Sequence, residues 1–141
     1  MTGAPDYATL LRGVPLFSAV SESSLQRVVE LATDVTHDAG HVVVKQGAGA
    51  HALHVIIEGE AAVEADGRSI ATLGPGDYFG EIAVIDRSRR TASVIAVTSL
   101  RAIALDATSF RRLVRSDPDL AIAVMGQMAQ RLSELEEQLG E

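Results

Sequence analysis

The stretch Phe79 to Val94 reads F-G-E-I-A-V-I-D-R-S-R-R-T-A-S-V, and the rest of the chain is interpreted around it. Gly80 has no Cβ, so backbone N–H groups near it can approach a ligand closely. Glu81 follows, and then a short apolar run, Ile82 to Ile85, with the length of about one helical turn. Because a single turn leaves its N–H groups without internal partners, its start is suited to an anion.

Arg90 lies near the end of this stretch, directly before a β-prone segment from Thr91 to Val97. Its planar guanidinium can form a bidentate pair with an oxyanion. The carboxylate of Glu81 can accept hydrogen bonds from hydroxyl groups. Between Glu81 and Arg90 three arginines outnumber two carboxylates, which makes the segment locally positive. Together these residues suit a small ligand that carries both hydroxyls and phosphate.

These residues resemble the phosphate-binding cassette of cyclic nucleotide-binding domains, whose pattern is close to F-G-E-[IL]-A-[LV]-[LI]-x-x-x-x-R-[TSA]-A-[TS]-V. Every specified position is filled here, with no insertion. The resemblance implies that Glu81 holds the ribose 2'-OH, that Arg90 holds the cyclic phosphate, and that the next residues offer backbone N–H groups. The ligand-binding residues that it implies are Phe79, Gly80, Glu81, Ile82, Ala83, Arg90, Thr91, Ala92 and Arg131.

The identity of the base is less directly indicated. Threonine at position 91, directly after the cassette arginine, is common in cGMP-binding kinase domains but also occurs in cAMP receptors. The segment from Gln127 to Leu132 resembles the dimer helix of regulators of the catabolite activator type, and Arg131 matches an arginine near the cyclic phosphate. Leu135 and Glu136 stand where those regulators have hydroxyl residues that contact adenine. We expect cAMP to be favoured over cGMP.

Composition limits the remaining possibilities. A chain of 141 residues can form one domain with a sizeable core. It has no cysteine, so disulfides and thiolate metal sites are not available. No apolar run approaches the ~20 residues of a membrane span, and the start of the chain lacks a signal-peptide pattern. The net charge of −7 argues against nucleic acid as the main partner. We therefore expect a cytoplasmic protein that binds neither membrane nor DNA.

The middle of the chain, residues 34–106, is a series of short β-rich runs punctuated by glycine. Asp66-Gly67 is a strong two-residue hairpin signal. Many short strands at regular spacing predict a mainly β fold with flanking helices, an antiparallel jelly-roll barrel, with a mouth for a ligand. The expected strands are Asp34 to His37, Val42 to Lys45, Ala52 to Glu58, Ala61 to Ala65, Ser69 to Leu73, Thr91 to Val97 and Leu100 to Asp106.

Helices are expected on both sides of this barrel, in residues 1–33 and 107–141, which completes a single domain over residues 1–141. Tyr7 to Arg12 can form a short helix, and Pro15 then disfavours helix at the preceding residue. Ser21 is a plausible N-cap for a second helix that ends near Leu31. After the barrel, Asp106 can cap a helix that runs to Ser116.

A long last helix is predicted from Pro118 to Leu139, about 33 Å in length, with Asp117 as its N-cap. Its apolar residues repeat with the 3-4-3-4 spacing of a coiled coil. This pattern favours a homodimer through the helix, although the same residues would also suit packing on the barrel. The residues of this stripe are Met125, Met128, Leu132, Leu135 and Leu139.

Jelly rolls also include metal-binding cupins, so the histidines require a separate test. Cupin ligands come as His-x-His, whereas His51 and His54 are three residues apart and would point to opposite faces of a strand. We therefore expect no metal and no cofactor, with His51 capping a loop and His54 on a solvated strand face. No nucleophile, general base or metal set appears, so we expect no catalytic residues and no enzyme activity.

The sequence thus predicts a non-catalytic cyclic nucleotide receptor that passes its signal through the last helix to an unknown downstream protein. Ser116 to Pro118 is the candidate hinge, and Arg131 is the helix residue whose charge can sense the ligand. No helix-turn-helix pattern is present, so DNA binding by this chain is not expected. Two alternatives remain: the sensory part of a catabolite-activator-like regulator, or an interaction module that has lost nucleotide binding.

Overall fold

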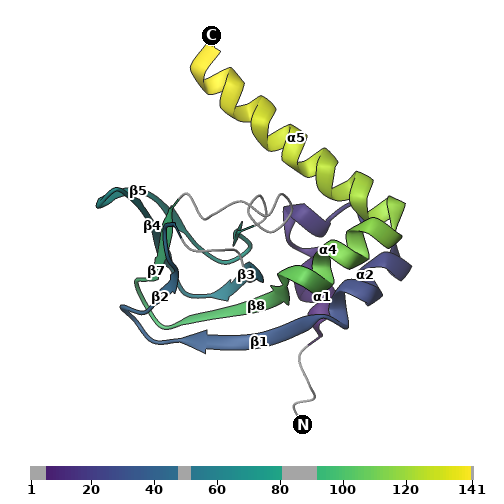
Figure 1. Ribbon diagram of the computed structural model, residues 1–141, viewed down its shortest axis with the longest axis horizontal. Coiled ribbons are helices and arrows are strands. Elements are labelled where there is room, and N and C mark those ends of the chain that lie inside the picture. The colour runs from purple at the N-terminus through teal and green to yellow at the C-terminus, as the bar shows by residue number, and fades with distance from the viewer. Residues whose placement is uncertain (1–5, 48–51, 81–91, 141) are drawn as a thin grey trace.

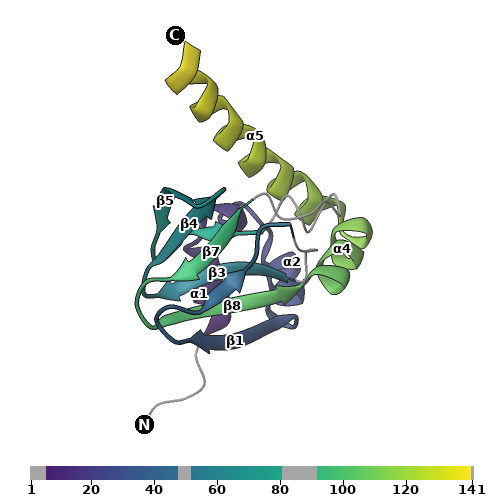
Figure 2. The same cartoon turned by 60° about the vertical axis from the view of Figure 1, so that its left-hand side comes forward.

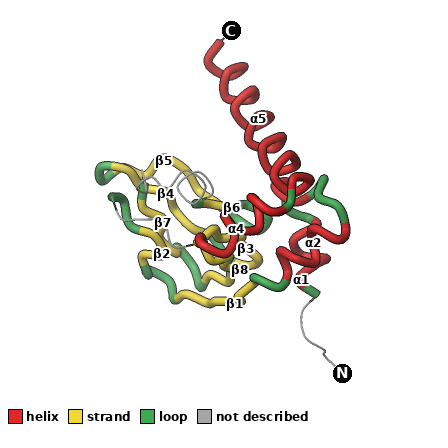
Figure 3. The backbone as a smooth tube through the Cα atoms, turned by 45° about the vertical axis from the view of Figure 1, so that its right-hand side comes forward, coloured by secondary structure: helices red, strands yellow, loops and turns green. Residues whose placement is uncertain are grey.

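The computed structural model describes residues 6–47, 52–80 and 92–140 of the chain. Within them, two antiparallel four-stranded sheets pack together, with helices before and after them (Figure 1). The short helices gather at one end of the sheets, and the long last helix projects away with the C-terminus at its tip. The same arrangement is visible after rotation (Figure 2) and in the backbone tube (Figure 3).

Each sheet combines strands from distant parts of the sequence. The first sheet has the order β1 (Ala32–His37), β8 (Leu100–Asp106), β3 (Ala52–Glu58) and β6 (Tyr78–Phe79). The second has the order β2 (Val42–Val44), β7 (Ser93–Ala96), β4 (Ala61–Ala65) and β5 (Arg68–Leu73). Neighbouring strands are antiparallel throughout. The predicted mainly β architecture with flanking helices is confirmed.

The turns between strands follow the glycine signals of the sequence. Asp66 and Gly67 both have positive φ, 53° and 79°, as a two-residue hairpin between β4 and β5 requires. Gly59 has φ +95°, and a Cβ built on it would lie 2.2 Å from the carbonyl oxygen of Ser99. Only glycine fits there, because both the backbone conformation and the space exclude a side chain.

The observed strands match the predicted runs within a residue or two, with one addition. β6 was not expected, because two residues are too few to show an alternating pattern. It pairs with β3 through His54 opposite Phe79 and Val55 opposite Tyr78. This short strand matters because it delivers the chain to the start of the predicted cassette.

Side-chain caps hold both N-terminal α-helices, and of these caps only Ser21 was predicted. α1 (Tyr7–Arg12) is capped by Asp6, and the 3-10 helix η1 (Pro15–Phe17) follows. α2 (Glu22–Val29) is capped by Ser21, whose hydroxyl accepts from the backbone N–H of Ser24 at 3.2 Å. α2 ends two residues before the predicted Leu31, since β1 already begins at Ala32.

The hydrophobic core is divided between two clusters. The larger one joins the helices to one face of the first sheet, and Phe17 meets Phe110 edge-on with 6.4 Å between ring centroids. The smaller one lies between the two sheets. Its buried members are Ile56, Ala61, Phe79, Val94, Ala96 and Leu100. β3 contributes to both clusters, so it is covered on both faces.

α4 (Ala107–Ser116) and α5 (Pro118–Gly140) meet at Asp117, which is 4% exposed. The Asp117 carboxylate accepts from the hydroxyl of Ser24 at 2.6 Å, from Arg27 Nη1 at 2.6 Å and from the backbone N–H of Leu120 at 3.1 Å. The predicted N-cap is therefore confirmed, and the same carboxylate fastens the start of α5 to α2. The candidate hinge at this junction stays a prediction.

Among the side chains of α5 that the structure describes, those that pack on the helical core lie in its first half. Leu120 and Val124 are buried, and Met128 is half-buried against the same core. Met125 and Leu132, however, are 59% and 58% exposed. The described part of the predicted apolar stripe is therefore split, with Met128 turned to the body of the protein and two residues exposed. The side chains of Leu135 and Leu139 lie outside the described part. None of the helices in the described residues is long and apolar enough to cross a membrane.

Candidate functional site

The predicted cassette connects the two sheets. The chain leaves the first sheet at the end of β6 and enters the second at the start of β7. The intervening predictions for Glu81, Ile82, Ala83, Arg90 and Thr91 fall outside the described residues. The backbone of position 131 lies in α5, but the side chain of Arg131 is also outside the described part. The described site residues are Phe79, Gly80 and Ala92, at the two ends of the cassette.

Both ends of the cassette are anchored in one core. Phe79 and Val94, 7% and 4% exposed, belong to the cluster between the sheets. Because the two residues come from different sheets, the cluster holds the entry and the exit of the segment in a defined relation. Ala92, just before β7, is half-buried. The described ends of the cassette are therefore held by the same core cluster.

Gly80 takes the turn out of β6. Its φ is +96°, a left-handed conformation that an L side chain adopts only with strain. The structure therefore gives this glycine a role in redirecting the chain at the second residue of the cassette, while close approach of its backbone to a ligand stays a prediction.

His54 supports the cassette from β3, and the prediction for it was wrong. It was expected on a solvated face, but it is 9% exposed and its ring stacks on Phe79 with 4.8 Å between centroids and 14° between planes. The reason is that the first sheet is covered on both sides, by the helices and by the second sheet. Sequence alternation alone does not report this burial. The position of His51 lies outside the described residues.

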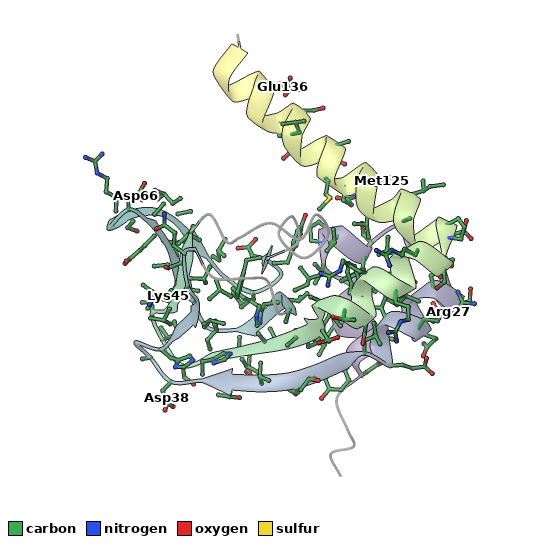
Figure 4. The ribbon with its side chains drawn as sticks, viewed as in Figure 1. Arg27, Asp38, Lys45, Asp66, Met125 and Glu136 are labelled. Carbon is green, nitrogen blue, oxygen red and sulfur yellow. The ribbon has the colours of Figure 1, made fainter. Side chains whose placement is uncertain are left out.

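A polar contact set that the sequence did not indicate lies where the chain leaves the cassette. The Ser93 hydroxyl accepts from the backbone N–H of Gln46 at 2.9 Å. The Gln46 side chain donates to Asp66 Oδ1 and accepts from the backbone N–H of Asp66, both at 3.0 Å. The end of β2 is thereby tied to the start of β7 and to the β4–β5 hairpin, whose tip Figure 4 marks at Asp66. These contacts span tens of residues in sequence and leave no local signal.

Another ion pair lies away from the cassette, on the first sheet. Arg101 Nη2 donates to Asp34 Oδ2 at 2.7 Å, and Tyr7 donates its hydroxyl to the same oxygen at 3.1 Å. The hydrogen bond from Arg101 is the main reason why the pKa of Asp34 is lowered. This group connects α1 with β1 and β8, so it serves the fold. Among the described residues, no group of three or more His, Cys, Asp or Glu side chains could hold a metal ion.

Three comparisons with known proteins agree with this architecture. The profile of the family described as "Cyclic nucleotide-binding domain" matches residues 34–117. A cAMP-dependent protein kinase regulatory subunit of Schizosaccharomyces pombe is 36% identical over 115 residues, covering 81% of this chain and 28% of the relative. A CRP-like cAMP-activated global transcriptional regulator of Mycobacterium tuberculosis is 27% identical over 128 residues, covering 87% of this chain and 57% of the relative.

Solved structures show the same fold. The Thermus thermophilus catabolite activator protein superposes with a TM-score of 0.76 at 28% identity, covering 89% of this chain and 61% of that one. A structure titled "cAMP bound PfPKA-R (141-441)" has the same TM-score at 25% identity, covering 95% of this chain and 46% of that one. The chain therefore spans between about a quarter and three fifths of the length of these similar proteins.

Proposed function

Because the chain belongs to the cyclic nucleotide-binding domain family, we propose that it is a receptor for a 3',5'-cyclic nucleotide, with cAMP favoured over cGMP. The observation that carries the proposal is the uninterrupted cassette pattern from Phe79 to Val94, inside the matched residues and between strands of the two sheets. Relatives named for cAMP support that choice of base. Regulatory relatives and the lack of a catalytic set in the sequence support a binding role without catalysis.

The proposed roles follow the chemistry of the cassette residues. Glu81 accepts from the ribose 2'-OH, and Arg90 pairs with the cyclic phosphate as a bidentate donor. Ile82 and Ala83 offer backbone N–H groups to the phosphate, while Thr91 contacts the phosphate or the base. Phe79, Gly80 and Ala92 hold the two ends of the segment, and Arg131 reaches the ligand from α5.

The signal would leave through α5. Half of that helix packs on the core and the other half projects from it, so a ligand contact at Arg131 can bias its position (Figure 1). We propose that residues 1–141 act as one cytoplasmic domain. It would form a homodimer through α5 and act on a downstream protein.

Isothermal titration calorimetry of the purified chain with cAMP and cGMP tests the binding proposal. Arg90→Leu removes a charge-assisted contact to a permanently anionic ligand, so the affinity for cAMP should fall about 30-fold or more. Arg89→Leu is the matched control, since it removes the same charge from the neighbouring position. Equal losses of cAMP affinity in both variants would mean that positive charge acts generally at this site, and not through a specific contact between Arg90 and the phosphate.

Glu81→Ala tests the ribose contact separately. The variant should lose affinity for cAMP by about tenfold, the effect of one hydrogen bond to a charged group. Its loss for 2'-deoxy-cAMP should be much smaller, because that ligand lacks the hydroxyl. If both ligands lost affinity equally, Glu81 would have no role at the ribose.

Hydrogen exchange with and without cAMP tests the signalling step. We expect cAMP to change the hydrogen-exchange protection between Pro118 and Gly140. Arg131→Ala should reduce this change in protection more than it reduces the affinity for cAMP. Unchanged protection in α5 at saturating cAMP would refute the coupling. Absence of both cAMP and cGMP binding in a folded chain would instead favour an interaction module.

A further inference from the structure

Gln46 makes hydrogen bonds to two separate elements of the second sheet. Its backbone N–H donates to the hydroxyl of Ser93, the first residue of β7. Its side-chain Nε2 donates to Asp66 Oδ1, and its Oε1 accepts from the backbone N–H of Asp66, at the tip of the β4–β5 hairpin. Gln46 therefore connects the end of β2 both to this hairpin and to the last part of the cassette.

Ser93 is held from β2 where the ladder between β2 and β7 has already ended. The last paired residues of that ladder are Val44 and Val94, and Gln46 lies two residues beyond Val44. On the other side of β7, Ser93 is opposite Glu64 of β4. The bond from Gln46 therefore extends the contact between β2 and β7 by one residue toward the cassette.

The hairpin fixes the other partner of Gln46. Asp66 has φ +53°, the left-handed conformation that the two-residue turn requires, so its N–H and its carboxylate belong to a defined turn. Two hydrogen bonds to this one turn restrict the rotamers of the Gln46 side chain. Figure 4 labels Asp66 and Lys45, the residue before Gln46, on the same side of the molecule. Gln46 therefore joins a defined turn to the start of β7.

The surroundings of these bonds favour a role in placement over a role in stability. Gln46 and Asp66 are exposed, and Ser93 is half-buried. Hydrogen bonds at exposed positions replace bonds to water, so they add little to the free energy of unfolding. They do restrict the groups that they join. One of these groups is Ser93, which follows Arg90 by three positions in the sequence.

We infer that Gln46 is a positioning residue for the phosphate contact of Arg90, and that it acts through Ser93 with the hairpin at Asp66 as its support. The inference rests on the proposed function, in which Arg90 binds the phosphate, and adds a residue outside the cassette. A bidentate pair between arginine and phosphate depends on geometry as well as on charge. Ordering Ser93 before a ligand arrives lowers the cost of ordering on binding. Gln46 therefore strengthens cyclic nucleotide binding without a contact to the nucleotide.

Gln46→Met tests this role without a change of charge. Methionine is similar in length but lacks the amide, so both side-chain bonds to Asp66 are lost while the backbone N–H remains. In calorimetry, cAMP affinity should fall about two- to tenfold, the range of one ordinary hydrogen bond. Tyr7→Phe is the matched control, because it removes an exposed hydrogen bond to Asp34 on the first sheet. Its urea midpoint should fall as much as that of Gln46→Met, while its cAMP affinity stays that of the wild type.

A reciprocal exchange tests the bond between Gln46 and Asp66 by rescue. Gln46→Glu places a carboxylate oxygen where Nε2 donates to Asp66, so two carboxylates repel each other and cAMP affinity should fall. Adding Asp66→Asn supplies an amide donor for that carboxylate, and asparagine tolerates the positive φ of this position. The double variant should therefore recover to within about twofold of the wild-type affinity. If net charge alone mattered, Asp66→Asn by itself would bind cAMP more tightly than the wild type, and that result would overturn the inference.

Coupling to Arg90 separates positioning from support of the fold. In an Arg90→Leu background, Gln46→Met should cause no further loss of cAMP affinity, because the contact that it positions is already gone. An equal loss in both backgrounds, or wild-type affinity in Gln46→Met, would overturn the inference and leave the proposed function intact. A wild-type chain that binds no cyclic nucleotide would refute the proposed function and the inference together.

Discussion

Asp117→Ala should destabilise the protein more than any other single carboxylate removal in the described residues. The carboxylate caps α5 by accepting a hydrogen bond from the backbone N–H of Leu120. It also accepts a hydrogen bond from the buried hydroxyl of Ser24 and forms an ion pair with Arg27. Those contacts are also why the pKa of Asp117 is lowered, with the bond from Ser24 as the largest cause. One side chain therefore serves as cap, buried acceptor and link between α2 and α5.

The expected loss is about 3 kcal/mol. An N-cap is typically worth ~1 kcal/mol, and a buried hydroxyl left without its acceptor costs about 1–2 kcal/mol. The pair with Arg27 adds roughly 0.5 kcal/mol or less, because that side chain is 54% exposed. With an unfolding entropy near 2.1 cal/mol/K per residue, a chain of this size should then melt about 10 °C lower.

Thermal and urea unfolding of Asp117→Ala measure this loss, and Asp119→Ala is the control. Asp119 is exposed in the first turn of the same helix and offers only a favourable dipole interaction of about 0.3–1 kcal/mol. In the wild type, the contribution of Asp117 is present above the ordinary pKa of 3.8 and is lost as pH falls through the lowered value. A loss in Asp117→Ala no larger than that of Asp119→Ala would refute the reasoning.

Three further outcomes follow from particular residues. Gly59→Ala should cost about 3 kcal/mol in urea unfolding, because left-handed strain is added to a clash with the Ser99 carbonyl, whereas Gly40→Ala, with open space around it, should cost only ~1 kcal/mol. Burial and then the charge of His41 lower the pKa of His37, so unfolding free energy should rise with pH between that lowered value and the ordinary 6.5, and the rise should disappear in His37→Gln. Thr91→Ala should weaken cGMP binding by about 1 kcal/mol more than cAMP binding if the hydroxyl contacts guanine, and equal changes in calorimetry would limit it to the phosphate.

Local signals in the sequence were sufficient for most of the fold. Ser21, Asp106 and Asp117 are all observed as N-caps because a capping side chain bonds a backbone N–H only two or three residues ahead. Asp66-Gly67 forms its hairpin for a similar reason, since the turn depends on the φ values of those two residues. Strand boundaries followed the glycine positions.

Contacts between distant residues could not be predicted in the same way. Nothing near Asp117 in sequence indicates that Ser24 donates to it across 93 positions. His54 is buried because both faces of β3 are covered, and the order of polar and apolar residues along β3 does not reveal this. The heptad spacing in α5 predicted that Met125 and Met128 lie on one apolar stripe. In the structure Met128 packs against the core, whereas Met125 and Ile122 are exposed.

In the candidate site, too, local features could be predicted from the sequence and contacts between distant residues could not. Its residue types and spacing were readable from the sequence, because the cassette is contiguous from Phe79 to Val94. The contacts that support the site could not be read from the sequence, because they join separate strands. They are the stack of His54 on Phe79 and the hydrogen bonds from Gln46 to Ser93 and Asp66. The roles of Glu81, Arg90 and Arg131 remain proposals that binding experiments decide.

The central claim is that this chain binds a cyclic nucleotide through Arg90, and one calorimetric experiment tests it most directly. Wild-type protein is titrated with cAMP and with 5'-AMP, and Arg90→Leu is titrated with cAMP under the same conditions. We predict saturable binding of cAMP, at least tenfold weaker binding of 5'-AMP, and a loss of about 30-fold or more in the variant. Wild-type affinity for cAMP in a folded Arg90→Leu protein would contradict the claim.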